Sequence, residues 1–493
     1  MSKTLKNILY VFAAASFAKI IGAFTSFLIP RILEPSNFGI WVTLSLIISY
    51  APIFALGTVE TLLKQFPRCV GEGNLTGAKI VEDSVFSSII ISASILFIIG
   101  LFFQLFIKEN SLNLYIPQIR LMIGASAVGL FSAYFLSRFT AHQIFKQYGI
   151  IDITRALVTC FFLVSFSWFW GLRGTVAGFF LAEIVTCLVS AVLSFKNCGN
   201  FGINFDYRLL WNAVRIGFPI TIVWWVLAFQ SSVDRLVSSY FLGKTATGYY
   251  GLGLSFVALM MQISIAVNKV FYPKISENIG NGLDKQALSK LVIMPAQILS
   301  LIIPALMGAL TLMLPFIYEI FFPKYMPGIL SAQIILLGSF SLCLVGNGSN
   351  YLIAYDKQGV LFLFVLISLF FNVLCSIIFV KIGFNIEGVA ISTVVAAAIL
   401  TTLVWKTVLK YLDYSIHKLL KEIVKLYLPF FVVLCLVIII TKLTHYFLLS
   451  EINIGIIEIS TFIVLYCLII FLIPPYRELG LKLYRYVRYH TGL

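Results

Sequence analysis

The sequence has 493 residues, of which 60% are hydrophobic and 11% are charged, and its mean hydropathy is +1.01. A soluble domain of ordinary composition carries about 25% charged residues, so these values exclude a soluble protein and predict one surrounded mostly by lipid. The formal net charge of +15 would favour nucleic-acid binding in a soluble chain. Here the basic residues lie in short loops between apolar runs, where they orient helices in a membrane.

An α-helix needs about 20 mainly apolar residues to cross the hydrocarbon core of a bilayer. The sequence contains fourteen runs of this kind, so we predict an all-α integral membrane protein with about fourteen transmembrane helices. In chain order the runs cover residues 7–29, 40–63, 84–107, 119–138, 149–170, 174–195, 213–235, 247–273, 288–314, 328–354, 359–380, 385–406, 422–441 and 455–474.

The loops between these runs differ in their content of Lys and Arg. If the N-terminus is cytoplasmic, the cytoplasmic segments contain nearly three times as many Lys and Arg residues as the segments on the opposite side. Such residues are retained on the cytoplasmic side when a membrane protein inserts. We therefore expect both termini to be cytoplasmic.

Short segments in the two halves of the sequence match at a nearly constant offset. They fall at the outer turn between the first two helices of a half, at the inner turn between its fourth and fifth helices, and at the start of its sixth. Such repeats are typical of transporters with two related lobes, which can open a central cavity to either side in turn. The matched pairs are residues 33–44 with 242–253, 145–149 with 355–359, and 176–177 with 389–390.

This repeat defines the expected domains. Residues 1–197 form an N-terminal lobe with spans one to six, and residues 198–411 form a pseudo-symmetric C-terminal lobe with spans seven to twelve. Residues 412–474 add two C-terminal spans. Residues 475–493 form a basic interfacial tail on the cytoplasmic side.

Lys19 lies about halfway along the first predicted span, where an ionisable side chain normally faces a cavity or a partner. Ser16, Ala23 and Ser26 share its helical face at spacings of three and four residues. This small, polar face favours a hydrated lumen, so Lys19 and Ser26 are candidate substrate-binding residues. The alternative is that Lys19 extends toward one membrane interface.

Polar residues also gather on single faces of the seventh and eighth spans, which predicts that these faces line a substrate cavity. Ordinary helix packing is the alternative for the seventh span, and Asp234 could form a local pair with Arg235. The candidates are Trp225, Ser232 and Arg235 in the seventh span, and Gln262 and Lys269 in the eighth.

Three acidic residues, Glu60, Asp234 and Glu183, are candidates for gating or coupling. The repeat puts Glu60 over Lys269, which predicts an acid and a base on opposite lobes that approach when the inner side closes. Glu183 lies near the middle of span six with no basic residue beside it in sequence. It is therefore either protonated or paired across helices, and it is the candidate proton-coupling carboxylate.

Other polar patterns have structural interpretations. Asp152 and Arg155 are spaced i, i+3, so an intrahelical pair is expected. The eight cysteines form no CxxC motif and have no nearby His, so we expect packing residues and no metal site. No Walker or HExxH motif is present and no outer loop is long enough to hold a catalytic domain, so we do not expect an enzyme.

Several segments of spans one to twelve carry a resemblance to a known family. They are Ala15–Lys19, Pro30–Gly39, Gly71–Asn74, Gly217–Pro219, Asp234–Arg235, Phe241–Tyr250 and Phe271–Ser276. These segments resemble the Wzx-type polysaccharide flippases, which include the O-antigen repeat-unit flippases. These flippases are the oligosaccharide-exporter branch of the multidrug/oligosaccharidyl-lipid/polysaccharide superfamily.

The resemblance implies a V-shaped pair of lobes that works as a secondary transporter. The implied substrate is an oligosaccharide repeat unit on undecaprenyl pyrophosphate, moved from the inner to the outer leaflet of a bacterial inner membrane for O-antigen, lipopolysaccharide or related assembly. Lys19, Arg235 and Lys269 suit this substrate because cationic side chains form charge-assisted hydrogen bonds with phosphate oxygens.

The same resemblance implies coupling to a proton or sodium gradient and no cofactor. Its expected partners are membrane lipids, a polysaccharide polymerase and a chain-length regulator. Three alternatives stay open: a lipid II flippase, whose substrate shares the pyrophosphate lipid, a multidrug antiporter, and a polysaccharide polymerase. Lys19 argues against the antiporter, because a lumen for cationic drugs would need acidic residues, and the short outer loops argue against the polymerase.

Overall fold

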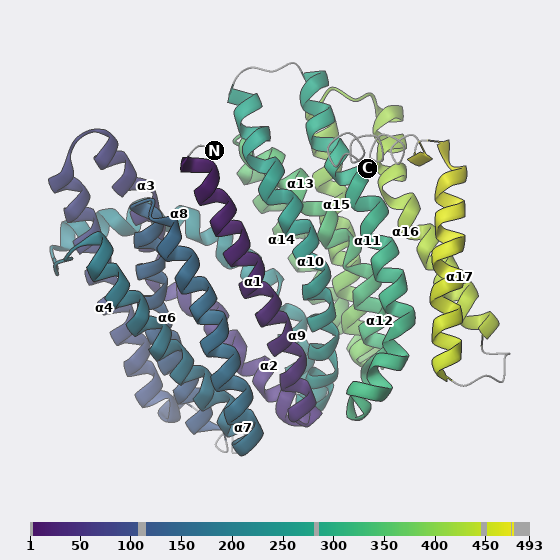
Figure 1. Ribbon diagram of the computed structural model, residues 1–493, viewed down its shortest axis with the longest axis horizontal. Coiled ribbons are helices and arrows are strands. Elements are labelled where there is room, and N and C mark those ends of the chain that lie inside the picture. Colours follow the sequence, from purple (N-terminus) through teal and green to yellow (C-terminus); the bar gives the residue numbers. More distant parts are fainter. Residues whose placement is uncertain (1–2, 107–114, 281–284, 445–450, 475, 478–493) are drawn as a thin grey trace. The chain divides into compact units, whose positions relative to one another are not determined.

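The computed structural model of this protein describes residues 3–106, 115–280, 285–444, 451–474 and 476–477. Within these residues every regular element is a helix (Figure 1), because only helices and closed barrels satisfy all their backbone polar groups in lipid. The elements are α1 (Lys3–Ile32), α2 (Pro35–Tyr50), η1 (Ala51–Ala55), α3 (Thr58–Gly71), α4 (Leu75–Phe106), α6 (Ile116–Ala141), α7 (Phe145–Cys198), α8 (Tyr207–Gln230), α9 (Val233–Val237), η2 (Ser238–Leu242), α10 (Gly243–Gly280), α11 (Lys285–Phe321), η3 (Pro323–Gly328), α12 (Ile329–Gly338), α13 (Phe340–Ala354), α14 (Gln358–Ile382), α15 (Asn385–Tyr411), α16 (Ile416–Thr444) and α17 (Glu451–Leu472).

Eleven helical segments of the described residues are long and apolar enough to cross a membrane. One of them, α7, contains two spans, because its backbone leaves the helical conformation at Gly171, with φ 55° and ψ −136°. Gln147 Nε2 donates to Asn197 Oδ1 at 3.0 Å, so the two arms of α7 run antiparallel, as predicted for spans five and six. The seventh and fourteenth predicted spans correspond to α8 and α17.

The chain divides into two compact units, residues 1–235 (unit 1) and 236–493 (unit 2). Unit 1 includes α8, which the sequence repeat assigns to the lobe that begins at residue 198. The reason is local packing, since α8 contacts α3 and Thr61 Oγ1 donates to the backbone oxygen of Ala213 at 2.6 Å. The predicted lobe boundary at residues 197 and 198 comes from the sequence repeat rather than from contacts, and it stays a prediction.

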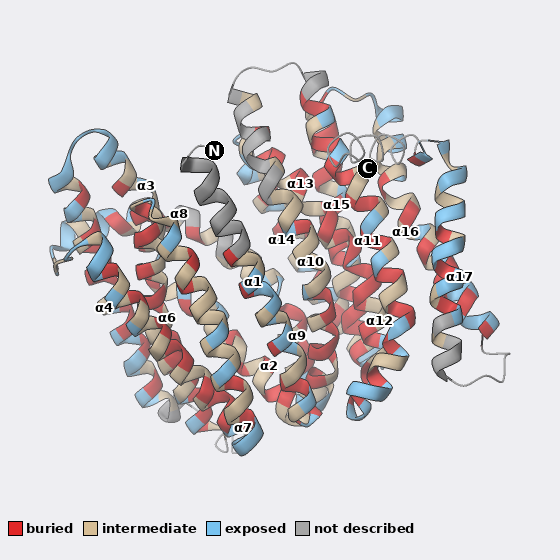
Figure 2. Ribbon diagram, in the orientation of Figure 1, coloured by how far each residue is buried: buried red, intermediate tan, exposed pale blue. Residues whose placement is uncertain are grey.

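Exposed residues occur along many of the helices (Figure 2), and a large number of them are apolar. On α4, for example, Ile95, Phe97, Ile98 and Leu101 are all about half exposed. Continuous apolar faces of this kind are unfavourable in water and favourable against lipid chains. They indicate a multi-pass membrane protein.

A buried ionic cluster joins α4, α6 and the end of α7 in unit 1, and no sequence pattern indicated it. The fully buried Arg138 donates from Nε to Glu82 Oε1 at 2.5 Å and from Nη2 to the backbone oxygen of Gly199 at 2.9 Å. His142 Nε2 lies 2.9 Å from the same Glu82 oxygen. Buried charges persist when they are paired and hydrogen-bonded, so this cluster holds the three helices together.

Hydrogen bonds from side chains to helix backbones connect the elements of unit 2. Trp405 of α15 is buried and donates from Nε1 to the oxygen of Leu344 in α13 at 3.2 Å. The last two helices pack against α11, where the Tyr466 hydroxyl of α17 donates to the oxygen of Leu301 at 2.7 Å. Helices α16 and α17 are therefore integral parts of unit 2.

Candidate transport site in unit 1

The second span is broken between α2 and α3. Pro52, which lacks a backbone N–H, lies in the 3₁₀ turn η1, and Leu56 (φ 47°) and Gly57 (φ 82°) follow in the left-handed region. Glycine adopts this conformation without steric strain. Discontinuous spans line ligand sites in many transporters, because their unwound backbone is tolerated beside a cavity.

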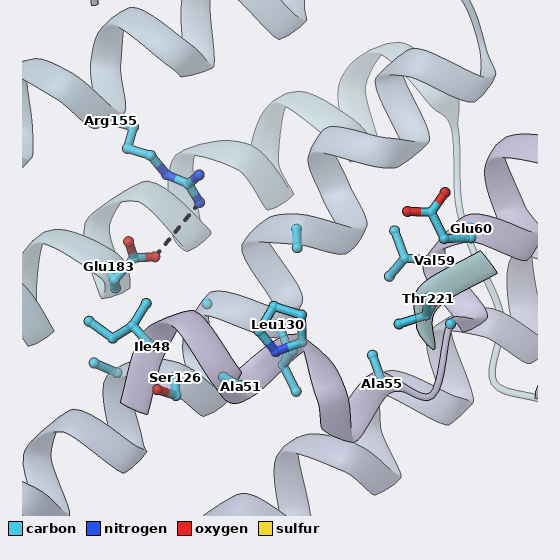
Figure 3. Close-up of a pocket in the computed structure, with 15 residues that line it drawn as sticks. Ile48, Ala51, Ala55, Val59, Glu60, Ser126, Leu130, Arg155, Glu183 and Thr221 are labelled. Atoms are coloured by element: carbon cyan, nitrogen blue, oxygen red, sulfur yellow. Dashed lines mark ion pairs between the residues drawn. The ribbon is translucent and has the colours of Figure 1, made fainter. Parts of the chain in front are cut away.

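A cavity of about 270 Å³ lies beside this break (Figure 3). Its wall combines small and apolar side chains of α2, η1 and α3 with residues of α6, α7 and α8. This volume lies at or below the lower limit of ordinary small-molecule pockets, so it suits water molecules or an ion better than an oligosaccharide. Its polar lining residues are Glu60, Ser126, Arg155, Glu183 and Thr221.

Arg155 and Glu183 face each other from the two arms of α7 (Figure 3). Arg155 Nη2 and Glu183 Oε2 are 3.8 Å apart, which is too long for a hydrogen bond. Arg155 Nε and Glu183 Oε2 are buried and have no hydrogen-bond partner among the described residues. Since Glu183 is only 8% exposed, its charge depends on this loose pair and on whatever enters the cavity.

The pair corrects one sequence prediction. Among the described residues Arg155 does not pair with Asp152 three residues before it, although their spacing would allow it. Instead Arg155 points to Glu183 on the other arm, because the reversal at Gly171 brings these two residues together. Glu183 therefore has a cross-helix partner in Arg155, while its protonation state and its role in coupling stay predictions.

Two glycines allow α8 to approach the break closely. An added Cβ on Gly217 would lie 1.8 Å from the backbone oxygen of Gly57, so a larger residue would push the two segments apart. One turn later, Thr221 donates to the oxygen of Gly217 at 3.1 Å and lines the cavity. The glycine contact thus makes α8 part of the cavity wall.

The residues after α8 that were predicted to bind substrate or to act as a gate form hydrogen bonds with other groups of the protein. Ser232 is buried and hydrogen-bonds the hydroxyl of Tyr50 in α2. The backbone N–H of Arg235 donates to Asp234 Oδ1 at 2.8 Å, and Arg235 Nη2 donates to the oxygen of Ser231 at 2.9 Å. The local Asp234–Arg235 pair is therefore present, and substrate or gate roles for Ser232, Asp234 and Arg235 stay predictions.

The candidates on α1 are exposed and do not line the cavity. Both Lys19 and Ser26 have exposed side chains, and Ser26 Oγ donates to the oxygen of Gly22 in its own helix at 2.9 Å. No ion pair of Lys19 occurs among the described residues. The cavity instead brings together two of the predicted coupling residues, Glu60 and Glu183.

The remaining candidates lie on α8 and α10. Half-buried Trp225 packs edge-on against Phe218, with ring centroids 5.5 Å apart, and its role in substrate binding stays a prediction. Gln262 donates back to the oxygen of Ala258 at 3.4 Å. The side chain of Lys269 lies outside the described residues, so its predicted approach to Glu60 stays a hypothesis.

Three polar residues of the cavity, Ser126, Arg155 and Thr221, were not among the predicted site residues, although one sequence signal marks the site. Arg155 was interpreted as half of a local pair, and Ser126 was not considered, although its Oγ is buried without a hydrogen-bond partner among the described residues. The signal is Pro52, because a proline inside a predicted span marks a place where the helix can break.

Residues 4–279, more than half of the chain, match the family described as polysaccharide biosynthesis protein. The chain belongs to this family. The match runs from α1 into α10 and contains every residue that lines the cavity of unit 1. It confirms the resemblance to polysaccharide flippases that the sequence motifs carry. None of the curated protein sequences matches the chain.

Solved transporters share the fold of this polysaccharide biosynthesis protein. The lipid II flippase MurJ, in an inward closed conformation, has a TM-score of 0.72 at 17% identity and covers 93% of this chain and 98% of its own. An inward-facing multidrug resistance MATE family transporter of the MOP superfamily has a TM-score of 0.68 at 14% identity and covers 81% and 94%. The Vibrio cholerae MATE transporter VcmN has a TM-score of 0.58 at 16% identity and covers 83% and 97%.

At these identities the comparison shows the fold alone. The fold is that of MOP-superfamily transporters, which confirms the predicted all-α membrane class.

Proposed function

We propose that this protein is a flippase that moves undecaprenyl-pyrophosphate-linked oligosaccharide repeat units from the inner to the outer leaflet of a bacterial inner membrane. The observation that carries the proposal is the polysaccharide biosynthesis family match over residues 4–279 in a chain with a transporter fold. A sugar polymer made at a membrane needs a route for its polar building blocks across the hydrocarbon core, and a transporter provides one.

The proposed setting follows from the same assignment. The protein supplies repeat units for O-antigen or a related surface polysaccharide, with both termini in the cytoplasm. Its partners are then a polysaccharide polymerase and a chain-length regulator on the opposite side. Two related lobes alternate in access, and cationic residues such as Lys19, Arg235 and Lys269 meet the pyrophosphate.

We propose that coupling to a proton or sodium gradient uses the cavity of unit 1. Arg155 and Glu183 are separated by 3.8 Å and have unpartnered buried atoms, so a proton or a small cation can reach Glu183 without breaking a hydrogen bond. Neutralising Glu183 leaves Arg155 without its counter-charge, which is unfavourable at a poorly hydrated site. Arg155 then needs a new partner, and Glu60 lines the same cavity.

A lipid II flippase is the second candidate. The observation that favours it is the fold similarity to MurJ, with a TM-score of 0.72 over 93% of this chain. Both candidate substrates carry a pyrophosphate on a polyprenyl lipid, so the two functions differ in the sugar that must pass between the lobes.

Deleting the gene tests the proposal. We expect loss of surface polysaccharide and accumulation of lipid-linked repeat units on the cytoplasmic face, both restored by the wild-type gene. Accumulation of lipid II with cell lysis would instead support the second candidate. Normal polysaccharide together with increased drug sensitivity would contradict both and indicate a multidrug antiporter.

A further inference from the structure

The first turns of α16 in unit 2 carry an exposed surface of mixed character, here called the α16 entry surface. Its apolar members are Ile416, Leu420 and Val424, which are 76%, 55% and 59% exposed. They are spaced four residues apart and so lie along one side of the helix. Its basic members His417, Lys418 and Lys421 are exposed as well and follow the apolar side around the helix.

The opposite side of the same turns faces the protein. Leu426 is buried, and Lys425 Nζ contacts Glu422 Oε1 at 2.5 Å, while Gln297 of α11 donates to Glu422 Oε2 at 3.2 Å. The acid and the base on this side thus neutralise each other. The positive charge of the entry surface has no such partner among the described residues.

Further basic residues lie at the same end of unit 2. The hydroxyls of Ser289 in α11 and Tyr414, just before α16, are 2.9 Å apart, which brings the exposed Lys290 next to the start of α16. At the end of α15, Lys410 is exposed and the Tyr411 ring lies 6.0 Å from Lys357 Nζ. The entry surface is therefore the apolar edge of a wider basic region.

We propose that the α16 entry surface binds the headgroups of anionic phospholipids. At the end of a membrane-spanning helix, apolar side chains beside lysines place the carbon chains in the acyl boundary and the charges at the lipid phosphates. An acidic soluble partner would need the charges alone and would leave the apolar side uncovered. This inference does not depend on the proposed flippase function.

The test is lipid binding to the purified full-length protein, measured by native mass spectrometry during titration with phosphatidylglycerol or phosphatidylcholine. The wild-type protein should prefer phosphatidylglycerol. In the double variant Lys418→Gln with Lys421→Gln, the affinity for phosphatidylglycerol should fall about 25-fold, since each lysine near an anionic surface contributes about a factor of five. Binding of phosphatidylcholine should not change.

The matched control is the double variant Lys381→Gln with Lys442→Gln. These exposed lysines lie in the last turns of α14 and α16, away from the entry surface. Their substitution removes the same net charge, so lipid preference should stay at the wild-type level. Leu420→Asn should weaken the binding of both lipids. Wild-type affinity in the Lys418/Lys421 variant, an equal loss in the control, or binding of undecaprenyl diphosphate without phosphatidylglycerol would overturn the proposal.

Discussion

Glu183 and Arg155 are the charged pair of the unit 1 cavity, and their looseness makes a clear mutational prediction. Glu183→Gln keeps the size of the side chain and removes its charge, which leaves Arg155 unpaired at a partly buried site. We expect export of repeat units to fall at least about tenfold, which corresponds to roughly 1.4 kcal/mol in the limiting step. The amount of surface polysaccharide in a deletion strain that carries the variant gene measures this export, and an immunoblot of the membrane fraction checks insertion.

Asp152→Asn is the control for this experiment. It removes a carboxylate from the same helix three residues before Arg155, yet Asp152 forms no ion pair among the described residues, so export should stay near the wild-type level. The double variant Arg155→Gln with Glu183→Gln removes the unpaired charge and should recover thermal stability without recovering export. Full export in Glu183→Gln would remove this carboxylate from the coupling mechanism.

Gly217 makes a second prediction at the scale of a single residue. Its missing side chain lets α8 approach Gly57, and a Cβ would lie 1.8 Å from that backbone oxygen. Gly217→Ala should therefore destabilise unit 1 by about 1–3 kcal/mol, the usual effect of overpacking. The apparent melting temperature of the purified protein should fall. Gly22→Ala, with open space around the added Cβ, should leave it unchanged or raise it slightly.

Two arginine–glutamate pairs of unit 1 differ in burial, which gives a prediction about how the helices are joined. Arg138 and Glu82 are 0% and 5% exposed and connect α6 to α4. Arg138→Ala leaves the Glu82 carboxylate buried with His142 as its remaining partner, and we expect a loss of about 3–5 kcal/mol. This loss of stability should appear as a reduced yield and a lower melting temperature of the purified variant.

The comparison pair is Arg68 in the last turn of α3 with Glu72 directly after the helix, spaced i, i+4 and largely exposed. Exposed pairs of this kind contribute little to stability, so Arg68→Ala should leave yield and melting temperature unchanged. Equal effects of the two alanine variants would mean that the buried cluster does not hold α4 and α6 together.

The helical elements could be predicted well from the sequence because each apolar run is long enough to span a bilayer, and the reversal at Gly171 separates two such runs. The break at Ala51–Ala55 was missed, since hydropathy continues through Pro52 without a drop. The cavity residues were found only in part. Glu60 and Glu183 stand out as charges in apolar runs, whereas Arg155 has an obvious partner in sequence and a different one in space. Long-range contacts of this kind depend on packing, which one sequence does not encode as a local pattern.

For the whole molecule, the distribution of Lys and Arg predicts the orientation in the membrane, and α16 allows a direct test. Its 29 residues span about 44 Å, which exceeds the roughly 30 Å hydrocarbon core, so exposed residues near its two ends lie on opposite sides. In a variant without the eight native cysteines, Lys418→Cys should react with a membrane-impermeant maleimide only after the cells are permeabilised. Lys442→Cys should react in intact cells.

The opposite labelling pattern would invert the topology, with consequences for each proposal. The α16 entry surface would then face the outer leaflet, and the direction of repeat-unit transport through the two lobes would need to be reassigned. Labelling of both cysteines from one side would mean that α16 does not span the membrane. The expected pattern places the exposed lysines at the start of α16 against the cytoplasmic leaflet. In the proposed function this is the leaflet from which the lipid-linked substrate departs, so anionic headgroups and the proposed pyrophosphate would meet the same cationic chemistry.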